Sequence, residues 1–275
     1  MEKKTKIQQI LNAFETGSAV GNYGAISVFE DAPGDRDQYT IGRSQTTESG
    51  GLKKMLQKYI DNKGKYANEM KPFVDRIQPH NGNGAYTKTI YPDKKFEALI
   101  KKAASDPIMI QTQDEFFDEM YWVPAFKFFK DNGFTLPLSM LTIYDTAIHS
   151  GPHLTSPRSM MSVLRKRFAE KTPAKGGDEK KWIEQYVNAR HSWLANHSRR
   201  PILRKTIYRT QTIKNLIKSD NWQLSGDIRT GNGVWIKETK VNPVIPTPVT
   251  PPKEITVEKP KLTLWQKIKS WFLGN

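Results

Sequence analysis

The segment at residues 136–149, LPLSMLTIYDTAIH, constrains the fold most strongly because most of its residues are apolar. A helix that is hydrophobic on all sides has to be buried, so we expect this segment to form a central helix. Asp145 lies within the segment and could hardly remain charged there without a partner. The chain contains no cysteine, so packing must hold the core together without disulfides.

Apolar residues elsewhere recur mostly at helical spacing, which predicts a mainly α-helical chain with one small β region near its start. Residues 25–29 and 38–43 have strand character and flank the turn-forming sequence Ala32-Pro33-Gly34-Asp35, so a hairpin or small sheet is expected. A first helix is predicted to end near Gly17. Further helical stripes or helices are predicted at 52–60, 96–103, 156–170, 178–197 and 202–218.

The composition changes after residue 241, which predicts three parts: a main domain at 1–241, a Pro-rich linker at 242–261 and an amphipathic helix at 262–275. The terminal helix combines Trp, Phe and Lys on a proline tether, as interfacial membrane anchors do. Docking of this helix on the main domain or on a partner is an equally open alternative. No signal peptide and no apolar run of membrane-spanning length is visible, so we expect the protein to be made as a soluble chain.

A formal net charge of +15 favours a polyanionic partner such as nucleic acid, anionic lipid or an acidic cell envelope. A solvated cationic surface explains the charge equally simply. We expect no nucleic acid partner because no nucleic-acid-binding motif is present. His149 and His153 are not accompanied by HExxH spacing or an acidic cluster, and no dinucleotide or phosphate loop occurs, so neither a metal nor another cofactor is expected.

Glu15 follows Phe14 at the end of the first predicted helix. A carboxylate there lies against the negative end of the helix dipole, and apolar surroundings would also favour its protonated form. A protonated carboxyl group is what a general acid needs, although a glutamate near a helix end is more often an exposed solubilising group. A general acid together with a second carboxylate would form the pair that glycoside hydrolysis requires. The predicted hairpin offers Asp35 and Asp37 as the second carboxylate.

These residues resemble the glycoside hydrolase family 46 chitosanases, which have a lysozyme-like fold. The resemblance is carried by AFETGS around Glu15, by GDRDQYTIG, by YDTAIHSG and by VNARHSW, and it extends over roughly residues 4–225. It implies two lobes, mainly helical, with a cleft between them. It also implies that 1–241 is a catalytic domain that hydrolyses the β-1,4 bonds of chitosan, with endo action and inversion. No cofactor would be required.

The resemblance assigns roles to individual residues. Glu15 matches the general acid, Asp35 the general base and Thr40 the residue that positions the attacking water, although the residues alone leave Asp35 and Asp37 as alternatives. Tyr39, in the same Tyr-Thr pair, and His149 are expected to bind substrate. Asp145, Arg190 and, less directly, Arg209 match a buried network that supports the base; a purely structural ion pair is the alternative. Action outside the cytoplasm is also implied.

Two features depart from the family pattern. Gly51 stands where the family has an aspartate that recognises chitosan, and Glu48 could substitute for it. The charge of +15 would also repel a cationic polymer unless the cleft itself were acidic. Peptidoglycan, cleaved by a lysin of the same fold, is therefore an alternative substrate. A non-catalytic protein that binds glycan and associates with membranes is a second alternative.

Overall fold

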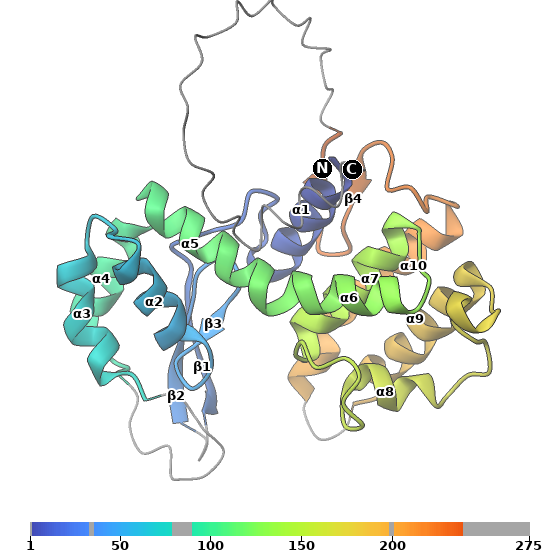
Figure 1. Cartoon of the computed structure of the whole chain (residues 1–275), viewed down its shortest axis with the longest axis horizontal. Coiled ribbons are helices and arrows are strands. Elements are labelled where there is room, and N and C mark those ends of the chain that lie inside the picture. The colour runs from blue at the N-terminus through green and yellow to red at the C-terminus, as the bar shows by residue number, and fades with distance from the viewer. Residues whose placement is uncertain (1, 33–35, 79–89, 198–200, 239–275) are drawn as a thin grey trace, which may run out of the picture. The chain divides into compact units, whose positions relative to one another are not determined.

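The computed structural model describes residues 2–32, 36–78, 90–197 and 201–238 (Figure 1). Residues 1–238 form one compact unit, and residues 239–275 form a second unit. The predicted linker at 242–261 and the predicted amphipathic helix at 262–275 therefore lie outside the described residues.

The first unit is mainly helical and carries a small sheet, as the sequence predicts. The helices are α1 (Glu2–Thr16), α2 (Leu52–Asp61), α3 (Ala67–Arg76), α4 (Lys94–Ala103), α5 (Pro107–Phe117), α6 (Val123–Asp131), α7 (Pro137–Ser150), α8 (Met160–Arg165), α9 (Glu179–Ala195) and α10 (Ile207–Lys218), with the π-helix η1 (Asp118–Trp122) and the 3-10 helices η2 (Pro173–Lys175) and η3 (Pro201–Thr206). The strands are β1 (Ile26–Ala32), β2 (Arg36–Ile41), β3 (Thr46–Thr47), β4 (Ile228–Arg229) and β5 (Trp235–Ile236).

The predicted hairpin is present as β1 and β2, which pair antiparallel, and β3 adds to the free side of β2. Tyr39 lies opposite Val28, and Thr40 lies opposite Ser27 on β1 and Thr47 on β3. Because successive side chains of a strand point to opposite faces, Tyr39 and Thr40 face in opposite directions.

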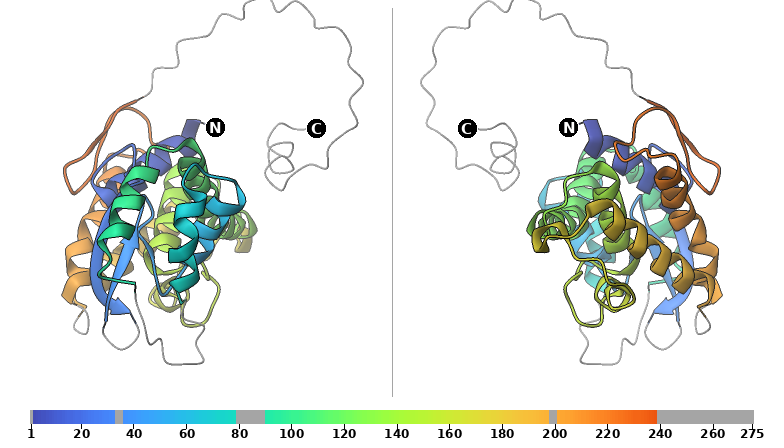
Figure 2. Two further views of the ribbon diagram at one scale, coloured as in Figure 1. Left: turned by 90° about the vertical axis from the view of Figure 1, so that its left-hand side faces the viewer. Right: turned by 90° about the vertical axis from the view of Figure 1, so that its right-hand side faces the viewer.

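Two separate hydrophobic cores divide the unit into two lobes, as the family resemblance implies. One core is built around β2 and helices α2–α5, and the other around α1, α6, α7, α9 and α10. Figure 1 shows the sheet and α2–α4 on one side and α6–α10 on the other, and Figure 2 shows the blue strands beside the teal helices from a second direction. Helices α5, η1 and α6 run on from one another, and Phe116 belongs to the first core whereas Phe117 belongs to the second.

Helix α7 is the central helix that its apolar sequence predicts, since every residue from Leu138 to Ala147 is buried. Its threonines are accommodated within the helix itself. Thr142 Oγ1 donates to the carbonyl of Leu138 at 2.8 Å, and Thr146 Oγ1 donates to the carbonyl of Thr142 at 2.9 Å. Asp145 is therefore the charged group for which this helix needs a partner from elsewhere.

The main difference from the predicted elements is at 156–170, where the helix covers only Met160–Arg165. The hydroxyl of Ser159 accepts a hydrogen bond from the backbone N–H of Ser162 at 3.1 Å, which makes Ser159 the N-cap and starts the helix late. The region predicted as a helix at 202–218 begins instead as the 3-10 helix η3, followed by α10.

Candidate active site

Glu15 lies in the last turn of α1, which is followed by Gly17 with a left-handed backbone (φ +69°) that glycine adopts without strain. The Glu15 side chain is 15% exposed, so it is accessible from solvent but largely enclosed. Its Oε1 accepts a hydrogen bond from Arg209 Nη2 at 2.6 Å. The expected helix-end position is therefore present, but the surroundings are not simply apolar.

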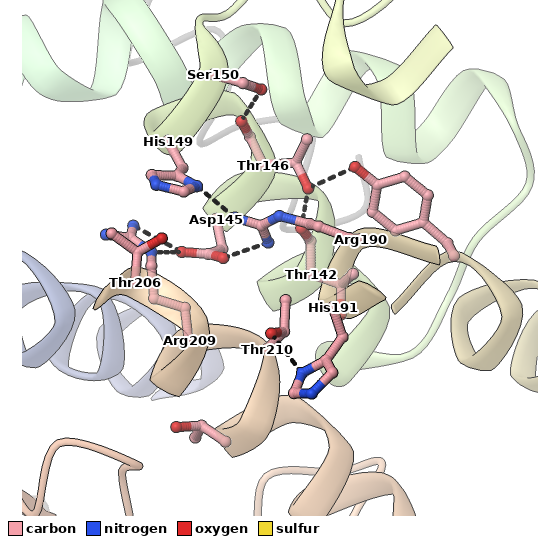
Figure 3. Close-up of polar contacts among 12 residues, drawn as sticks. Thr142, Asp145, Thr146, His149, Ser150, Arg190, His191, Thr206, Arg209 and Thr210 are labelled. Atoms are coloured by element: carbon pink, nitrogen blue, oxygen red, sulfur yellow. Dashed lines mark hydrogen bonds and ion pairs between the residues drawn. The ribbon is translucent and has the colours of Figure 1, made fainter. Parts of the chain in front are cut away.

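The structure brings together the predicted network residues Asp145, Arg190 and Arg209 from helices α7, α9 and α10 (Figure 3). Arg190 Nη1 donates to one carboxylate oxygen of Asp145 at 2.5 Å, and Arg209 Nε donates to the other at 2.8 Å. Burial alone would raise the pKa of Asp145, but the two guanidinium groups outweigh it and lower the pKa to about 2. Asp145 is therefore ionised at any physiological pH.

Arg209 connects this network to Glu15, because its Nη2 lies 2.7 Å from Asp145 Oδ1 and 2.6 Å from Glu15 Oε1. The network of Glu15, Asp145, Arg190 and Arg209 thus contains equal numbers of carboxylates and guanidinium groups. Because Arg209 contacts Asp145 as well as Glu15, a proton on Glu15 would not leave Arg209 without a carboxylate partner. This arrangement can hold a carboxyl group in one place in either of its protonation states.

His149 lies one turn after Asp145 on α7, and its Nδ1 lies 3.1 Å from Arg190 Nη2. A guanidinium group can only donate, so Nδ1 accepts and the ring proton is on Nε2. Burial lowers the pKa of His149 to about 3, with further contributions from Arg209 and Arg190. His149 is therefore a neutral imidazole, and its predicted contact with substrate stays a prediction.

The π-helix η1 carries Tyr121, a residue that interacts with Glu15 and that no motif in the sequence indicates. The pKa of Tyr121 is raised by burial and, secondly, by the negative charge of Glu15. Asp118, also on η1, accepts hydrogen bonds from Lys4 Nζ at 2.6 Å and from Gln8 Nε2 at 3.2 Å on α1. The aromatic-rich sequence at 114–130 gives no sign of a π-helix, so spacing could not have identified Tyr121.

On the other lobe, the structure supports a polar role for Thr40 but leaves the base undecided. Thr40 is buried, and within the described ranges its Oγ1 has no hydrogen-bond partner. A hydroxyl of that kind is free to hold a water molecule or a ligand. Asp35 lies outside the described residues. Asp37 is exposed at the start of β2.

Tyr39 requires a correction, because the structure places it in a hydrophobic core and leaves none of it exposed. Its hydroxyl donates to Glu97 Oε1 at 2.8 Å and accepts from the backbone N–H of Asp93 at 2.8 Å. Burial raises its pKa to about 12. The side chain points away from the Thr40 face of the strand, so it packs the lobe rather than contacting a sugar.

Glu48 does not take the place of the missing aspartate. It is 1% exposed, and its two carboxylate oxygens accept from the backbone N–H groups of Tyr39 at 2.8 Å and Ile90 at 2.7 Å. Gly51 is equally constrained, since a Cβ at this position would lie 2.7 Å from Phe116 Cζ and 3.3 Å from Thr46 Cγ2. The region that differs from the family pattern is therefore tightly packed.

Comparison with known proteins agrees with this architecture. The sequence model of glycosyl hydrolase family 46 matches residues 9–228. The chain belongs to glycosyl hydrolase family 46. The chitosanase of Bacillus subtilis (strain 168) is 27% identical over 234 residues, which cover 82% of this chain and 81% of that protein.

Solved structures of family 46 members have the same fold. A mutant chitosanase from Bacillus subtilis MY002 complexed with 6 GlcN has a TM-score of 0.70 and 23% sequence identity, covering 87% of this chain and 99% of that one. The Gynuella sunshinyii family 46 chitosanase in complex with chitotetraose has a TM-score of 0.72 and 23% identity, covering 86% and 97% of the two chains. Membership of the family makes the protein a glycosidase.

Within the described parts of the chain, no group of His, Asp and Glu side chains is arranged to hold a metal ion. Nor does any helix in these ranges combine the length and the apolar character that crossing a bilayer requires. The expectations of a metal-free site and of no cofactor rest on the sequence analysis.

Proposed function

We propose that this family 46 glycosidase hydrolyses the β-1,4 bonds of chitosan by an inverting, endo-acting mechanism in which Glu15 is the general acid. The observation that carries the proposal is the Glu15 carboxyl group, which is partly exposed at the end of α1 and held at 2.6 Å by Arg209, an arginine that also contacts Asp145. The proposal is further supported by relatives that are named chitosanases and by related structures that bind GlcN oligomers.

In this mechanism Glu15 gives its proton to the glycosidic oxygen as the C1–O bond breaks. Asp35 takes a proton from a water molecule whose oxygen bonds to C1 from the opposite face, and Asp37 is the alternative base. Thr40 is suited to orient this water because its buried Oγ1 has no partner among the described residues. An inverting pair of carboxyl groups stands about 6.5–9.5 Å apart to admit the water. No cofactor takes part in these steps.

The charge of the site matters more for a cationic substrate than the charge of the whole chain. The formal net charge is +15, but the two arginines at Glu15 and Asp145 are balanced by those two carboxylates. Ionised aspartates at 35 and 37 would make the site locally acidic. Peptidoglycan, the alternative substrate, would instead present acidic groups to the cationic surface.

The experiment is to measure reducing ends released from chitosan and from purified peptidoglycan by wild type and by Glu15→Gln. We expect release from chitosan, and a loss of about 10²–10⁴-fold in the variant, because that is the range a positioned general acid supplies. Glu69→Gln, which makes the same change on the exposed face of α3, should leave activity unchanged. The anomer of the first product, observed by NMR, tests inversion.

Three results would contradict the proposal in different ways. Full activity of Glu15→Gln would reject this residue as the acid. Release from peptidoglycan and not from chitosan would indicate a lysin. Retention of either polymer in a pull-down without any release would indicate a glycan-binding protein that is not an enzyme.

We also propose that the protein acts outside the cytoplasm and that residues 262–275 bind an anionic membrane surface. The support is the sequence pattern of Trp, Phe and Lys in this segment, together with the family resemblance. Flotation with vesicles that contain anionic lipid, comparing the full chain with a chain that ends at Lys240, tests the membrane contact. Equal flotation of the two chains would refute it.

A further inference from the structure

The position of Glu15 presents a structural difficulty for a general acid. Helix α1 ends at Thr16, so Glu15 belongs to the last turn, where backbone carbonyls have no partners within the helix. Helix ends fray for this reason. A catalytic carboxyl group, however, has to be held within about 0.5 Å of its productive position.

Two side chains from the C-terminal part of the unit supply the missing donors. Tyr208 donates its hydroxyl proton to the carbonyl of Phe14 at 2.7 Å, and Asn232 Nδ2 donates to the carbonyl of Ala13 at 2.7 Å. The carbonyl of Ala13 also accepts from the backbone N–H of Gly17 at 3.1 Å. The residues just before Glu15 are thus fixed by groups 194 and 219 positions away in the sequence.

The two donors are themselves held together. The backbone N–H of Gly231 donates to Thr212 Oγ1 at 2.7 Å, and Thr212 Oγ1 donates to the carbonyl of Tyr208 at 2.8 Å. Gly231 packs so closely that a Cβ there would lie 2.6 Å from the carbonyl oxygen of Tyr208. The turn that carries Asn232 and the first turn of α10 therefore form one continuous support beneath the end of α1.

We propose that Tyr208 and Asn232 are positioning residues for the general acid: they prevent the last turn of α1 from fraying and so keep the Glu15 carboxyl group where it can protonate the leaving oxygen. This inference rests on the proposed role of Glu15. Tyr208 and Arg209 are adjacent in the sequence, so the first turn of α10 holds both the backbone before Glu15 and its side chain. Burial raises the pKa of Tyr208, which keeps the phenol protonated and able to donate.

The variant Tyr208→Phe removes one oxygen and keeps the ring, which packs edge-on against Phe14 at 5.9 Å. We expect kcat on chitosan to fall by about 10-fold or more, because small displacements of a catalytic group are costly, while KM changes by less than about 2-fold. Asn232→Ala should have a smaller effect, because Ala13 keeps its bond from Gly17. Hydrogen exchange of a peptide covering residues 10–18 should become faster in Tyr208→Phe.

A substrate with an activated leaving group distinguishes positioning of the acid from general damage. A dinitrophenyl chito-oligosaccharide needs little protonation on departure, so Tyr208→Phe should lose less than about 3-fold with it. Glu15→Gln should show the same contrast between the two substrates. Tyr59→Phe is the matched control, because it removes a buried hydroxyl that donates to Asp106 in the other lobe, and it should leave kcat on both substrates unchanged.

The inference is overturned if Tyr208→Phe keeps wild-type kcat on chitosan, or if it loses the same factor on both substrates. Its failure can be told from that of the proposed function. If Glu15→Gln is fully active, the proposed acid is wrong and this inference falls with it. If Glu15→Gln is inactive on chitosan while Tyr208→Phe is normal, only the positioning role is wrong.

Discussion

Each lobe contains a carboxylate that is almost completely buried, Asp145 in one and Glu48 in the other, and the two are stabilised in different ways. Asp145, in one lobe, accepts from the guanidinium groups of Arg190 and Arg209. Glu48, in the other, accepts from backbone N–H groups and makes no direct ion pair among the described residues. Burial raises the pKa of both, but only at Asp145 do neighbouring cations reverse the effect and lower it to about 2, whereas the pKa of Glu48 stays raised.

The difference shows which lobe is built to hold charge. The Asp145 network reaches Glu15 through Arg209, so it fixes the group that we propose as the general acid. Glu48 instead ties β2 to Ile90, four residues before α4, and thereby shapes the lobe that carries Thr40. Asp145 therefore supports the position of the Glu15 side chain, whereas Glu48 holds two backbone segments together.

The largest expected effect is that of Asp145→Asn. The variant leaves Arg190 and Arg209 with one fewer buried anion, and breaking a buried pair costs about 3–5 kcal/mol. We expect a loss of that size in the free energy of unfolding, measured with urea. We also expect a loss of activity, because Glu15 would then be the one carboxylate paired with Arg209. If the free energy of unfolding of Asp145→Asn lies within about 1 kcal/mol of the wild-type value, the ion pairs of Asp145 do not stabilise the fold more than the backbone bonds of Glu48 do.

The pairing of Asp145 with arginines could be predicted from the sequence. A single aspartate in a mostly apolar helix has to find cations, and Arg190 and Arg209 lie where the family pattern places them. The sequence was not sufficient for Glu48, because TTES reads as a polar, exposed turn. Nor could it find Tyr208 and Asn232, whose role depends on contacts with residues about 200 positions away and on no local pattern.

The two carboxylates should also respond to pH in opposite directions. The pKa of Asp145 is lower in the folded protein than in the unfolded chain, so its stabilisation is complete above about pH 4 and is lost as the pH falls towards 2. The size is on the order of 2 kcal/mol. The raised pKa of Glu48 has the opposite sign: the folded protein takes up this proton more readily, and the contribution is lost as pH rises.

Unfolding curves of wild type, Asp145→Asn and Glu48→Gln from pH 2 to neutral separate these contributions. The gap between wild type and Asp145→Asn should narrow below about pH 4. The gap between wild type and Glu48→Gln should be wider at acidic than at neutral pH. If the difference in unfolding free energy between wild type and each variant does not change with pH, neither carboxylate has the pKa shift assigned to it.

A smaller effect is expected from Glu48→Gln at neutral pH. The amide oxygen can accept one of the two backbone N–H bonds, while the amide NH₂ faces the other donor, so we expect a loss of about 1–3 kcal/mol. Activity per folded molecule should be retained, because Glu48 is enclosed and does not replace the chitosan-recognising aspartate. A rise in KM for chitosan without a change in stability would instead place Glu48 in the substrate site.

The smallest effect should be that of Tyr39→Phe, which tests whether Tyr39 packs the core or contacts substrate. Tyr39 precedes Thr40, and their adjacency in a motif suggested a shared role, whereas strand alternation places the two side chains on opposite faces. Removing the hydroxyl deletes its bonds to Glu97 and to the N–H of Asp93, so we expect about 1 kcal/mol less stability by thermal unfolding. The kcat and KM on chitosan should stay at wild-type values, because the ring remains in the core.

Thr40→Val, on the opposite face, keeps the volume and removes the unpartnered hydroxyl, so it should lower kcat with little loss of stability. If Tyr39→Phe raises KM instead, the tyrosine contacts substrate and the two faces of β2 do not divide the work between packing and catalysis.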